Sequence, residues 1–441
     1  MAHRSASGGE FQLGLAEGTL GRGAGIFGDK FSMQNYLTFV IENRRFLAYG
    51  LLFTMVSSFG HTYFIGLFGA EIRAEFGLSH GSFGSIYSLA TLGSGVAVIW
   101  LGRKIDDVDL RLYTALVCAA LVAACFFLAL APGVAFLTLA LFSLRLAGPG
   151  LTVHAATTSM ARYFGGQRGK ASAIASLGQT AGEAALPLIA VALSAAIGWR
   201  LTWGVLGAAA ALVIVPAVLW TLKGHGERHR RLLEDPPAET ARGGPSGRQY
   251  SRREVLRDPR FYLILPATMA HLVILSGLFF HQVHLADSKG WSLTWLATCF
   301  VGYAVAKVAS TLVSGQLVDR LGAQRLLPYY MAPTGMAMLA LAFFDHPATA
   351  LFYMMAMGTS TGAWITISGA LWAEIYGIAH LGAVRALVQA LLLISVALAP
   401  AAMGWLIDRG ITMEAIAVIC LGLGAACTAL LYVPAVRASN R

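Results

Sequence analysis

Three charged side chains stand in stretches of the sequence that otherwise hold apolar and small residues. Arg145 lies within LFSLRLAGPGLTVH, Glu183 lies in a block that begins at residue 170, and Lys307 lies in a block that begins at residue 292. A charge at the centre of a membrane-spanning helix costs at least about 2.5 kcal/mol on insertion scales, so such residues usually face a bundle interior and mark a functional pathway. Each of the three is therefore a candidate site residue.

Polar residues recur at helical spacing around two of these charges, in intervals of three or four residues. One stripe consists of Ser172, Ser176, Gln179 and Glu183, and the other of Tyr303, Lys307, Thr311 and Ser314. Such spacing puts the side chains on one face of a helix. We expect the two stripes to line opposite walls of a wet cavity. Because the two cations there outnumber the one carboxylate, a small anion is the expected ligand.

The positions of Arg145 and Glu183 along the chain predict that they can pair. Arg145 precedes Arg162 by 17 residues and Glu183 follows Arg168 by 15, which places both roughly 22 to 26 Å from the same membrane face at 1.5 Å per residue. Two interpretations are open. The pair either only fixes packing, or it couples transport, with Glu183 exchanging a proton as Arg145 changes its partner. We favour the coupling role.

Two aromatic side chains are further candidates for substrate binding. His61 shares a stripe with three hydroxyl residues, and Trp364 is flanked by Ser360 and Ser368. A histidine can bind a substrate or a proton, and a tryptophan can stack on a substrate, but both residues also serve as packing groups in membrane helices. Both interpretations stay open for each residue.

The remaining reactive side chains give little support to metal or enzyme chemistry. His281, His284 and Asp287 are spaced at i, i+3 and i+6, but no fourth ligand accompanies them, so a polar helix end is the favoured interpretation. The five cysteines all lie in apolar blocks and predict neither disulfides nor a thiolate site. No nucleophile with a base and no G-x-x-x-x-G-K-[ST] loop is present. We therefore expect no metal, no cofactor and no enzymatic activity.

The elements that position these residues are long apolar blocks. Of 441 residues, 57% are hydrophobic and 12% are charged, about half the charge of a typical soluble domain. Twelve blocks approach or exceed the roughly 20 residues that cross a membrane as a helix. They cover residues 46–70, 80–101, 112–131, 134–160, 170–194, 201–222, 261–283, 292–316, 326–344, 347–372, 384–406 and 412–434. The expected fold class is an all-α integral membrane protein.

A polar stretch between the sixth and seventh blocks divides the chain into two halves. The expected organisation is a disordered cytoplasmic tail at 1–44, a six-helix bundle at 45–222, a cytoplasmic linker at 223–260, a second six-helix bundle at 261–434 and a tail at 435–441. The side of the membrane that holds the tails and the linker carries 26 of the 32 Lys and Arg residues. The positive-inside rule then puts both termini in the cytoplasm. This topology accounts for the net charge of +10 without nucleic-acid binding.

A repeated motif relates the two halves. The second block is followed by GRKIDDVDLR and the eighth by GQLVDRLGAQR, and each places an Asp four residues after a Gly. Such an Asp can accept hydrogen bonds from a helix amino-terminus or an Arg in one conformation and lose them in another. We predict a conformational latch formed by Gly102, Asp106 and Arg111 in the first copy and by Gly315, Asp319, Arg320 and Arg325 in the second.

The second copy resembles the signature of the major facilitator superfamily, G-x-L-x-D-R-x-G-x-R-R, whereas the first copy departs from it at Asp107 and Asp109. Further matching features are Arg145 with Gly148 and Gly150, Gly178 with Gly182, and GWR at residues 198–200. The resemblance implies two pseudo-symmetric six-helix bundles that rock around a central site.

Two longer segments resemble the monocarboxylate and oxalate:formate branch of that superfamily. They are RYFGGQRGKASAIASLGQTAGE at residues 162–183 and APAAMGWLIDRG at residues 399–410. The branch carries an arginine in an R-P-x-x-G pattern of the eighth helix. Thr311 occupies that position here, and the nearest cation is Lys307, one turn earlier.

The first functional hypothesis is a secondary transporter in the cell membrane that moves a monocarboxylate together with a proton. Its expected substrate-binding residues are Arg145, Lys307, His61, Tyr303, Gln179 and Trp364, and its proton-coupling residue is Glu183. The expected partners are a small organic anion, protons and membrane lipid, and the expected state is a monomer. Two alternatives are a proton-driven exporter of amphipathic or cationic compounds and a non-transporting receptor on the same scaffold.

Overall fold

The computed structural model describes residues 33–234, 250–377 and 380–433. The expected tail at 435–441 and much of the expected amino-terminal tail and linker lie outside these ranges. By its contacts the chain divides into a unit at residues 1–45 and a unit at residues 46–441. The charged residues and motifs singled out from the sequence all lie in the second unit, which begins inside the first long helix.

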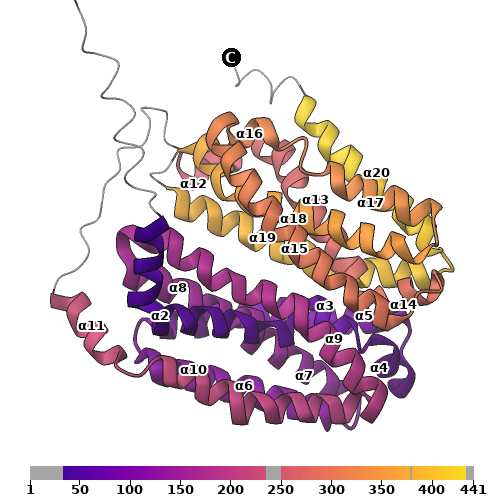
Figure 1. Cartoon of the computed structure of the whole chain (residues 1–441). Helices are drawn as coiled ribbons and strands as arrows, with labels where there is room; N and C mark the ends of the chain where they lie inside the picture. Colours follow the sequence, from indigo (N-terminus) through magenta and orange to yellow (C-terminus); the bar gives the residue numbers. More distant parts are fainter. Residues whose placement is uncertain (1–32, 235–249, 378–379, 434–441) are drawn as a thin grey trace, which may run out of the picture. The chain divides into compact units, whose positions relative to one another are not determined.

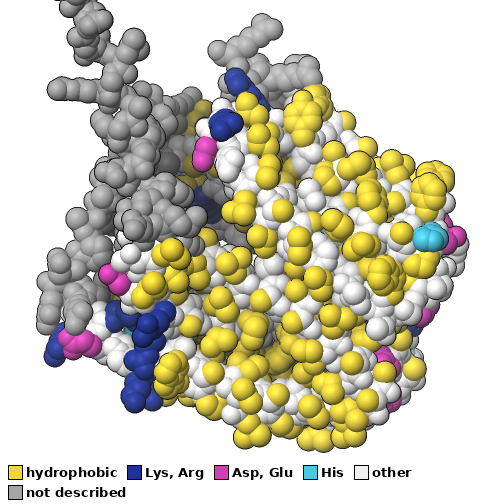
Figure 2. All heavy atoms as spheres, viewed as in Figure 1, with side chains coloured by type: hydrophobic (Ala, Val, Ile, Leu, Met, Phe, Trp, Pro, Cys, Tyr) yellow, Lys and Arg dark blue, Asp and Glu magenta, His cyan; other side chains and the backbone are white. Residues whose placement is uncertain are grey.

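Every regular element in the described ranges is a helix, so the predicted fold class is confirmed (Figure 1). Within the described residues, eight helices are long and apolar enough to cross a membrane, and nine if a bent pair near the amino-terminus is counted as one span. Large apolar side chains are exposed on these helices, such as Leu212 at 77% and Phe343 at 72%. Figure 2 shows hydrophobic side chains spread over the visible face and charged ones near its margins. A surface this apolar suits lipid and not water.

The first six predicted blocks fall on the helices of the first half. These are α2 (Met33–Val56), η2 (Ser57–Gly60), α3 (Thr62–Gly66), α4 (Gly69–Phe76), α5 (His80–Leu101), η3 (Gly102–Ile105), α6 (Leu110–Ala129), α7 (Val134–Arg145), η4 (Leu146–Thr152), α8 (Val153–Phe164), η5 (Gly165–Gln167), α9 (Arg168–Ala209), η6 (Ala210–Ile214) and α10 (Val215–Thr221). Predicted blocks five and six meet inside α9, at Gly198, whose φ of +76° breaks the helical path.

A linker helix and the second half follow. They consist of α11 (His225–Glu234), α12 (Arg252–Arg257), α13 (Pro259–Phe280), α14 (Gln282–Ser288), α15 (Leu293–Leu321), α16 (Ala323–Leu326), α17 (Ala332–Phe343), α18 (Pro347–Tyr376), α19 (Leu381–Asp408), α20 (Met413–Ala429) and η7 (Leu430–Tyr432). Helix α17, with 12 residues, is shorter than its predicted block.

Glycines set how closely the helices around the charged residues approach one another. A Cβ atom on Gly358 or Gly362 of α18 would lie 2.3 Å from the carbonyl oxygen of Tyr303 or Lys307 in α15. A Cβ atom on Gly178 of α9 would lie 1.8 Å from the carbonyl oxygen of Leu51 in α2. Backbone contact of this kind holds α15 and α9 in fixed rotation, which determines where their polar stripes face.

Candidate functional site

A buried ion pair connects the two halves of the molecule. The Nζ atom of Lys307 in α15 donates to Oε2 of Glu183 in α9 at 2.7 Å, and the two side chains are only 7% and 6% exposed. The Nε2 atom of Gln179, one turn before Glu183, donates to the other carboxylate oxygen at 3.0 Å. Both predicted polar stripes therefore meet here, and each oxygen of the carboxylate has a donor.

The predicted pairing of Arg145 with Glu183 is wrong. Arg145 instead donates through Nη1 to the carbonyl oxygen of Gly60 at 3.0 Å and lies 5.5 Å above the ring of Tyr87. Its Nε atom is buried without a partner. The matched depths of Arg145 and Glu183 gave no information about which way each helix face turns, and Lys307 of the other half occupies the position next to the carboxylate.

Two interruptions of regular helix meet beside Arg145. The first span breaks at η2, after which His61 is extended, and the fourth changes to a π-helix at η4, with non-helical torsion angles at Gly148. A Cβ atom on Gly148 would lie 3.0 Å from the Gly60 backbone. Discontinuous helices free carbonyl groups at membrane depth. The Gly60 carbonyl that accepts from Arg145 is one of these.

Of the remaining predicted binding residues, Tyr303 lies beside the ion pair, and His61 lies at the break in the first span. The Nε2 atom of His61 lies 3.3 Å from Oγ of Ser57. Tyr303 lies 5.9 Å from the Lys307 ammonium, measured to the ring centre, and donates its hydroxyl to Thr361 at 3.3 Å.

Trp364 lies on α18, about one turn beyond Thr361. Its indole Nε1 donates to the carbonyl oxygen of Thr268 in α13 at 2.7 Å. Trp364 is therefore fixed within the second half and has no hydrogen bond to the ion pair among the described residues.

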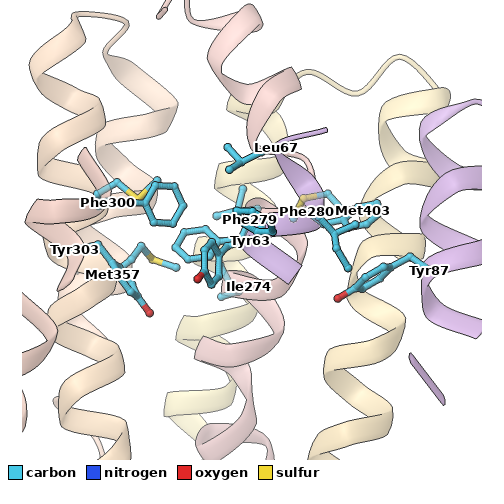
Figure 3. Close-up of a cluster of buried hydrophobic side chains, with 14 of the residues drawn as sticks. Tyr63, Leu67, Tyr87, Ile274, Phe279, Phe280, Phe300, Tyr303, Met357 and Met403 are labelled. Atoms are coloured by element: carbon cyan, nitrogen blue, oxygen red, sulfur yellow. The ribbon is translucent and has the colours of Figure 1, made fainter. Parts of the chain in front are cut away.

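Aromatic rings close one end of the site. We define the aromatic plug as Tyr63, Tyr87, Phe280 and Phe300. Tyr63 of the first half lies 5.5 Å from Phe300 of the second, and Tyr87 lies 4.6 Å from Phe280, both measured between ring centres. Figure 3 shows these residues together with Phe279, Tyr303 and Met403. All four rings of the plug are buried, so the plug separates the ion pair from the end of the bundle where α5 begins.

We call that end the far side, and the end that carries the two repeated motifs the latch side. On the far side Asp408, the last residue of α19, joins the halves at the amino-terminus of α5. Its carboxylate accepts from Oγ of Ser79 at 2.7 Å and from the backbone N–H groups of His80 and Gly81 at 2.9 and 2.8 Å. A carboxylate at a helix amino-terminus is stabilised by the helix dipole. The sequence analysis did not identify Asp408. Ser79, an N-cap residue before α5, marks a helix amino-terminus at which a carboxylate can bind.

The residues of the first latch motif contact the ends of neighbouring helices. Asp106 forms an ion pair with Arg162, at the end of α8, and Asp109 caps α6 by accepting from the N–H groups of Arg111 and Leu112 at 2.9 and 3.2 Å. Arg111 therefore contributes its backbone to the first latch. The carbonyl oxygen of Gly102 lies 3.1 Å from Nε2 of His154.

The second latch is not closed by its aspartate. Asp319, Arg320 and Arg325 are exposed, and Asp319 makes no hydrogen bond or ion pair with the part of the chain that the structure describes. Glu374 of α18 caps α16 instead, accepting from the N–H group of Ala323 at 2.8 Å. Gly315 is not tightly packed, because a Cβ atom added there would lie 3.6 Å from Cγ2 of Thr366. Sequence analysis missed Glu374, because it lies outside the motif.

Hydrogen bonds between described residues of the two halves thus occur at two levels only. One is the Lys307–Glu183 pair, and the other is the far side, where Gln282 also donates to the carbonyl oxygen of Tyr63 at 2.5 Å. Neither Asp106 nor Asp319 bonds across the halves. The halves are therefore bonded to each other from mid-depth to the far side.

The predicted metal-ligand face has other contacts. His281 is buried and its Nε2 atom donates to the carbonyl oxygen of Pro400 at 2.9 Å, while the ring of His284 lies 4.4 Å from that of His80. Within the described ranges, no group of His, Cys, Asp and Glu has an arrangement that could hold a metal ion. All five cysteines are buried and free.

Comparisons with known proteins agree with this architecture. The sequence matches the family model described as Major Facilitator Superfamily over residues 50–300 and 274–441. No curated protein matches the sequence.

Solved transporter structures share the fold. A bacterial homolog of the human lysosomal transporter Spinster, in an inward-facing and occupied conformation, has a TM-score of 0.60 at 17% identity over 92% of this chain and 94% of that one. In its unoccupied form the score is 0.62 at 16% identity, over 92% and 98%. A mutant of the nucleoside transporter NupG has a score of 0.63 at 14% identity, over 88% and 99%. At these identities the likeness shows the fold alone.

Proposed function

Because the chain belongs to the major facilitator superfamily, and is therefore a multi-pass membrane transporter and not an enzyme, we propose that it moves a small organic anion together with a proton by alternating access. The observation that carries the proposal is the Lys307–Glu183 pair, buried where the two halves meet. A monocarboxylate is the proposed substrate, in keeping with the segments at residues 162–183 and 399–410.

Charge balance at the pair gives a mechanism for coupling. In the empty site the Lys307 ammonium neutralises Glu183. If Glu183 takes up a proton, Lys307 loses its partner and can bind the carboxylate of a substrate instead. Both the empty site and the site loaded with a proton and an anion carry one ammonium and one carboxylate. Binding a proton alone leaves the buried Lys307 ammonium without its carboxylate, and breaking a buried pair in that way typically costs about 3–5 kcal/mol. An anion bound alone must share Lys307 with the ionised Glu183. Proton and anion are therefore expected to cross together.

Arg145 adds a second cation to this site without a carboxylate of its own among the described residues. Its guanidinium has donors left over after the bond to Gly60, and the buried Nε atom is one of them. A guanidinium binds carboxylates in a bidentate manner, which a single ammonium cannot do. We assign Arg145 the orientation of the substrate carboxylate, with His61, Gln179 and Tyr303 around it.

The topology follows from the same proposal. The positive-inside rule places both termini and the latch side in the cytoplasm. The far-side contacts of Asp408 and the aromatic plug then close the site to the exterior. Opening the exterior would break these contacts and allow Asp106 and Asp319 to bond elsewhere. We propose that the protein acts as a monomer in the cell membrane, in contact with lipid and without nucleic acid.

A binding and flux experiment tests the proposal. Purified protein is screened by thermal shift against carboxylates, nucleosides and amphipathic amines, and anion flux is measured in proteoliposomes with an imposed pH gradient. We expect carboxylates to stabilise the protein. A pH gradient that is acidic outside the vesicles should drive carboxylates into the lumen. Lys307→Met should abolish flux, whereas Lys104→Met, which removes an exposed lysine that pairs with Asp107, should not. Stabilisation by amines alone would favour the exporter, and absence of any ligand-dependent stabilisation or flux would favour a receptor.

A further inference from the structure

A mostly apolar pocket with a few polar side chains lies within the second half, apart from the ion pair. It has a volume of about 220 Å³ and lies between α13, α18 and α19. Its apolar wall includes Met269, Trp364 and Trp372, and its polar groups include Ser368, Arg385 and Gln389. We propose that this pocket binds the carboxylate of a small aromatic or branched organic anion on its way between the latch side and the ion pair.

The depth of the pocket supports a position on that route. Lys307 is 14 residues from the latch-side end of α15 at Leu321, or about 21 Å along the helix. Trp364 is 12 residues from the latch-side end of α18, or about 18 Å, and Arg385 is four residues from the beginning of α19, or about 6 Å. The pocket thus occupies the depth range between the latch-side surface and the buried pair.

The charge of the pocket points to an anion. Arg385 donates through Nη2 to the carbonyl oxygen of Gly369, and no carboxylate among the described residues lies within ion-pair distance of it. A guanidinium held by one carbonyl retains donors for a planar acid group. Gln389, one turn further along α19, is exposed and adds an amide. Arg385 is exposed, so an anion that enters the pocket can reach its guanidinium.

The walls of the pocket point to a small and apolar body for this anion. The indole of Trp364 is fixed by its hydrogen bond to Thr268, and Trp372 is only 2% exposed and stacks with Tyr376 at 6.2 Å. Rigid aromatic faces bind aromatic or branched groups at low entropic cost. The volume is below the roughly 300–1,000 Å³ of pockets for drug-sized ligands, so it accommodates one small acid and excludes a large one.

Gly369 offers a way to fill the pocket without disturbing the fold. A Cβ atom there would meet no other atom within 4 Å, and the same holds for Gly382 in α19, which does not line the pocket. Gly369→Leu is therefore the test variant and Gly382→Leu its matched control. For the charge, Arg385→Gln is the test variant, and Arg409→Gln, at the far-side end of α19, is the control.

Binding of benzoate to the full-length protein tests the proposal, with uncharged benzamide as the second probe. Tryptophan fluorescence and saturation-transfer NMR are recorded in nanodiscs of zwitterionic lipid and again with anionic lipid added. We expect benzoate but not benzamide to bind, and Arg385→Gln and Gly369→Leu each to weaken binding on the order of tenfold or more. The two control variants should bind as the wild type does. Loss of benzoate binding only when anionic lipid is added would identify a lipid headgroup as the competing occupant and overturn the role in anion passage.

One variant separates this proposal from the proposed function. The role in passage rests on anion transport, but the pocket itself does not use Lys307, so Lys307→Met should abolish flux and leave benzoate binding to the pocket intact. In flux assays Arg385→Gln should raise KM for the anion with little change in kcat, because it removes a binding contact and not the coupling pair. Unchanged benzoate binding in both Arg385→Gln and Gly369→Leu would overturn the proposal, even if anion transport itself is established.

Discussion

Asp408 is expected to hold the far side closed, and replacing it with asparagine tests this. The substitution keeps the shape of the side chain and removes the charge that accepts three hydrogen bonds from the first turn of α5. Hydrogen bonds to charged groups contribute about 1.5–3 kcal/mol and neutral ones about 0.5–1.5, and a charge at a helix amino-terminus adds about 0.3–1 kcal/mol. Asparagine still accepts through one oxygen, and Asp408 is exposed, so we count the loss of one hydrogen bond to a charged group and of the helix-end charge, each at the low end of its range.

The expected cost is therefore about 1–2 kcal/mol, and it falls only on the conformation in which the halves touch at the far side. A change of that size moves the equilibrium between closed and open far sides by about 5- to 30-fold. Spin labels at exposed Ala74 of α4 and Ala348 of α18 report the far-side distance. The five native cysteines are buried and should not react with the label.

We expect Asp408→Asn to increase the population with a long distance between the labels. Asp345→Asn is the matched control, since Asp345 is also on the far side but binds Lys289 within the second half, at 2.6 Å. Identical distance distributions in wild type and Asp408→Asn would refute the reasoning. So would an equal shift in the Asp345→Asn control.

Two further substitutions test packing and charge outside the coupling pair. Gly60→Ala should lower the melting temperature by several degrees, because its Cβ atom would lie 2.2 Å from the carbonyl oxygen of Leu144; an unchanged thermal melt would contradict the tight contact. Lys289→Met should also destabilise the protein but leave substrate selectivity unchanged. Burial lowers the pKa of Lys289, but its hydrogen bonds to Asp345 and Glu414 outweigh this and hold the pKa above its usual range. The lysine therefore stabilises the fold at all pH values below the ordinary lysine pKa of 10.5, and this contribution is lost only as the pH rises through the elevated pKa. Thermal melts of wild type and variant between pH 6 and 9 should differ by a constant amount.

The fold class could be predicted from the sequence because a membrane leaves few choices. Backbone groups in lipid must bond within the segment, so a long apolar block becomes a helix. The positions at which the helices break were harder to predict from the sequence. Gly198 separates two blocks by a positive φ, as its place between them suggested, but the broken helix at Ser57–Gly60 has no proline and was not predicted.

The partners of the charged residues could not be predicted from depth alone. Arg145 and Glu183 were placed at similar depth, yet Lys307 takes the carboxylate because α9 and α15 face each other across the two halves. That rotation depends on glycine contacts such as Gly362 against the Lys307 backbone. Spacing along one helix contains no information about such contacts between distant segments.

The motif residues show the same limit. The sequence motif correctly located polar turns after the second and eighth spans, but Asp106 pairs with Arg162, and Glu374 caps the helix beside the second copy. The partners come from the ends of neighbouring spans, and the spacing within a motif does not specify them.

Proton movement in Glu183→Gln proteoliposomes tests the central claim most directly. A pH-sensitive dye is trapped inside the vesicles, and an anion gradient is applied to wild type and variant. We expect anion influx to acidify the lumen in the wild type, whereas the variant should exchange anion for anion without moving protons, since its side chain cannot titrate. Acidification by Glu183→Gln at the wild-type ratio of protons to anions would contradict the assignment of Glu183 as the coupling residue.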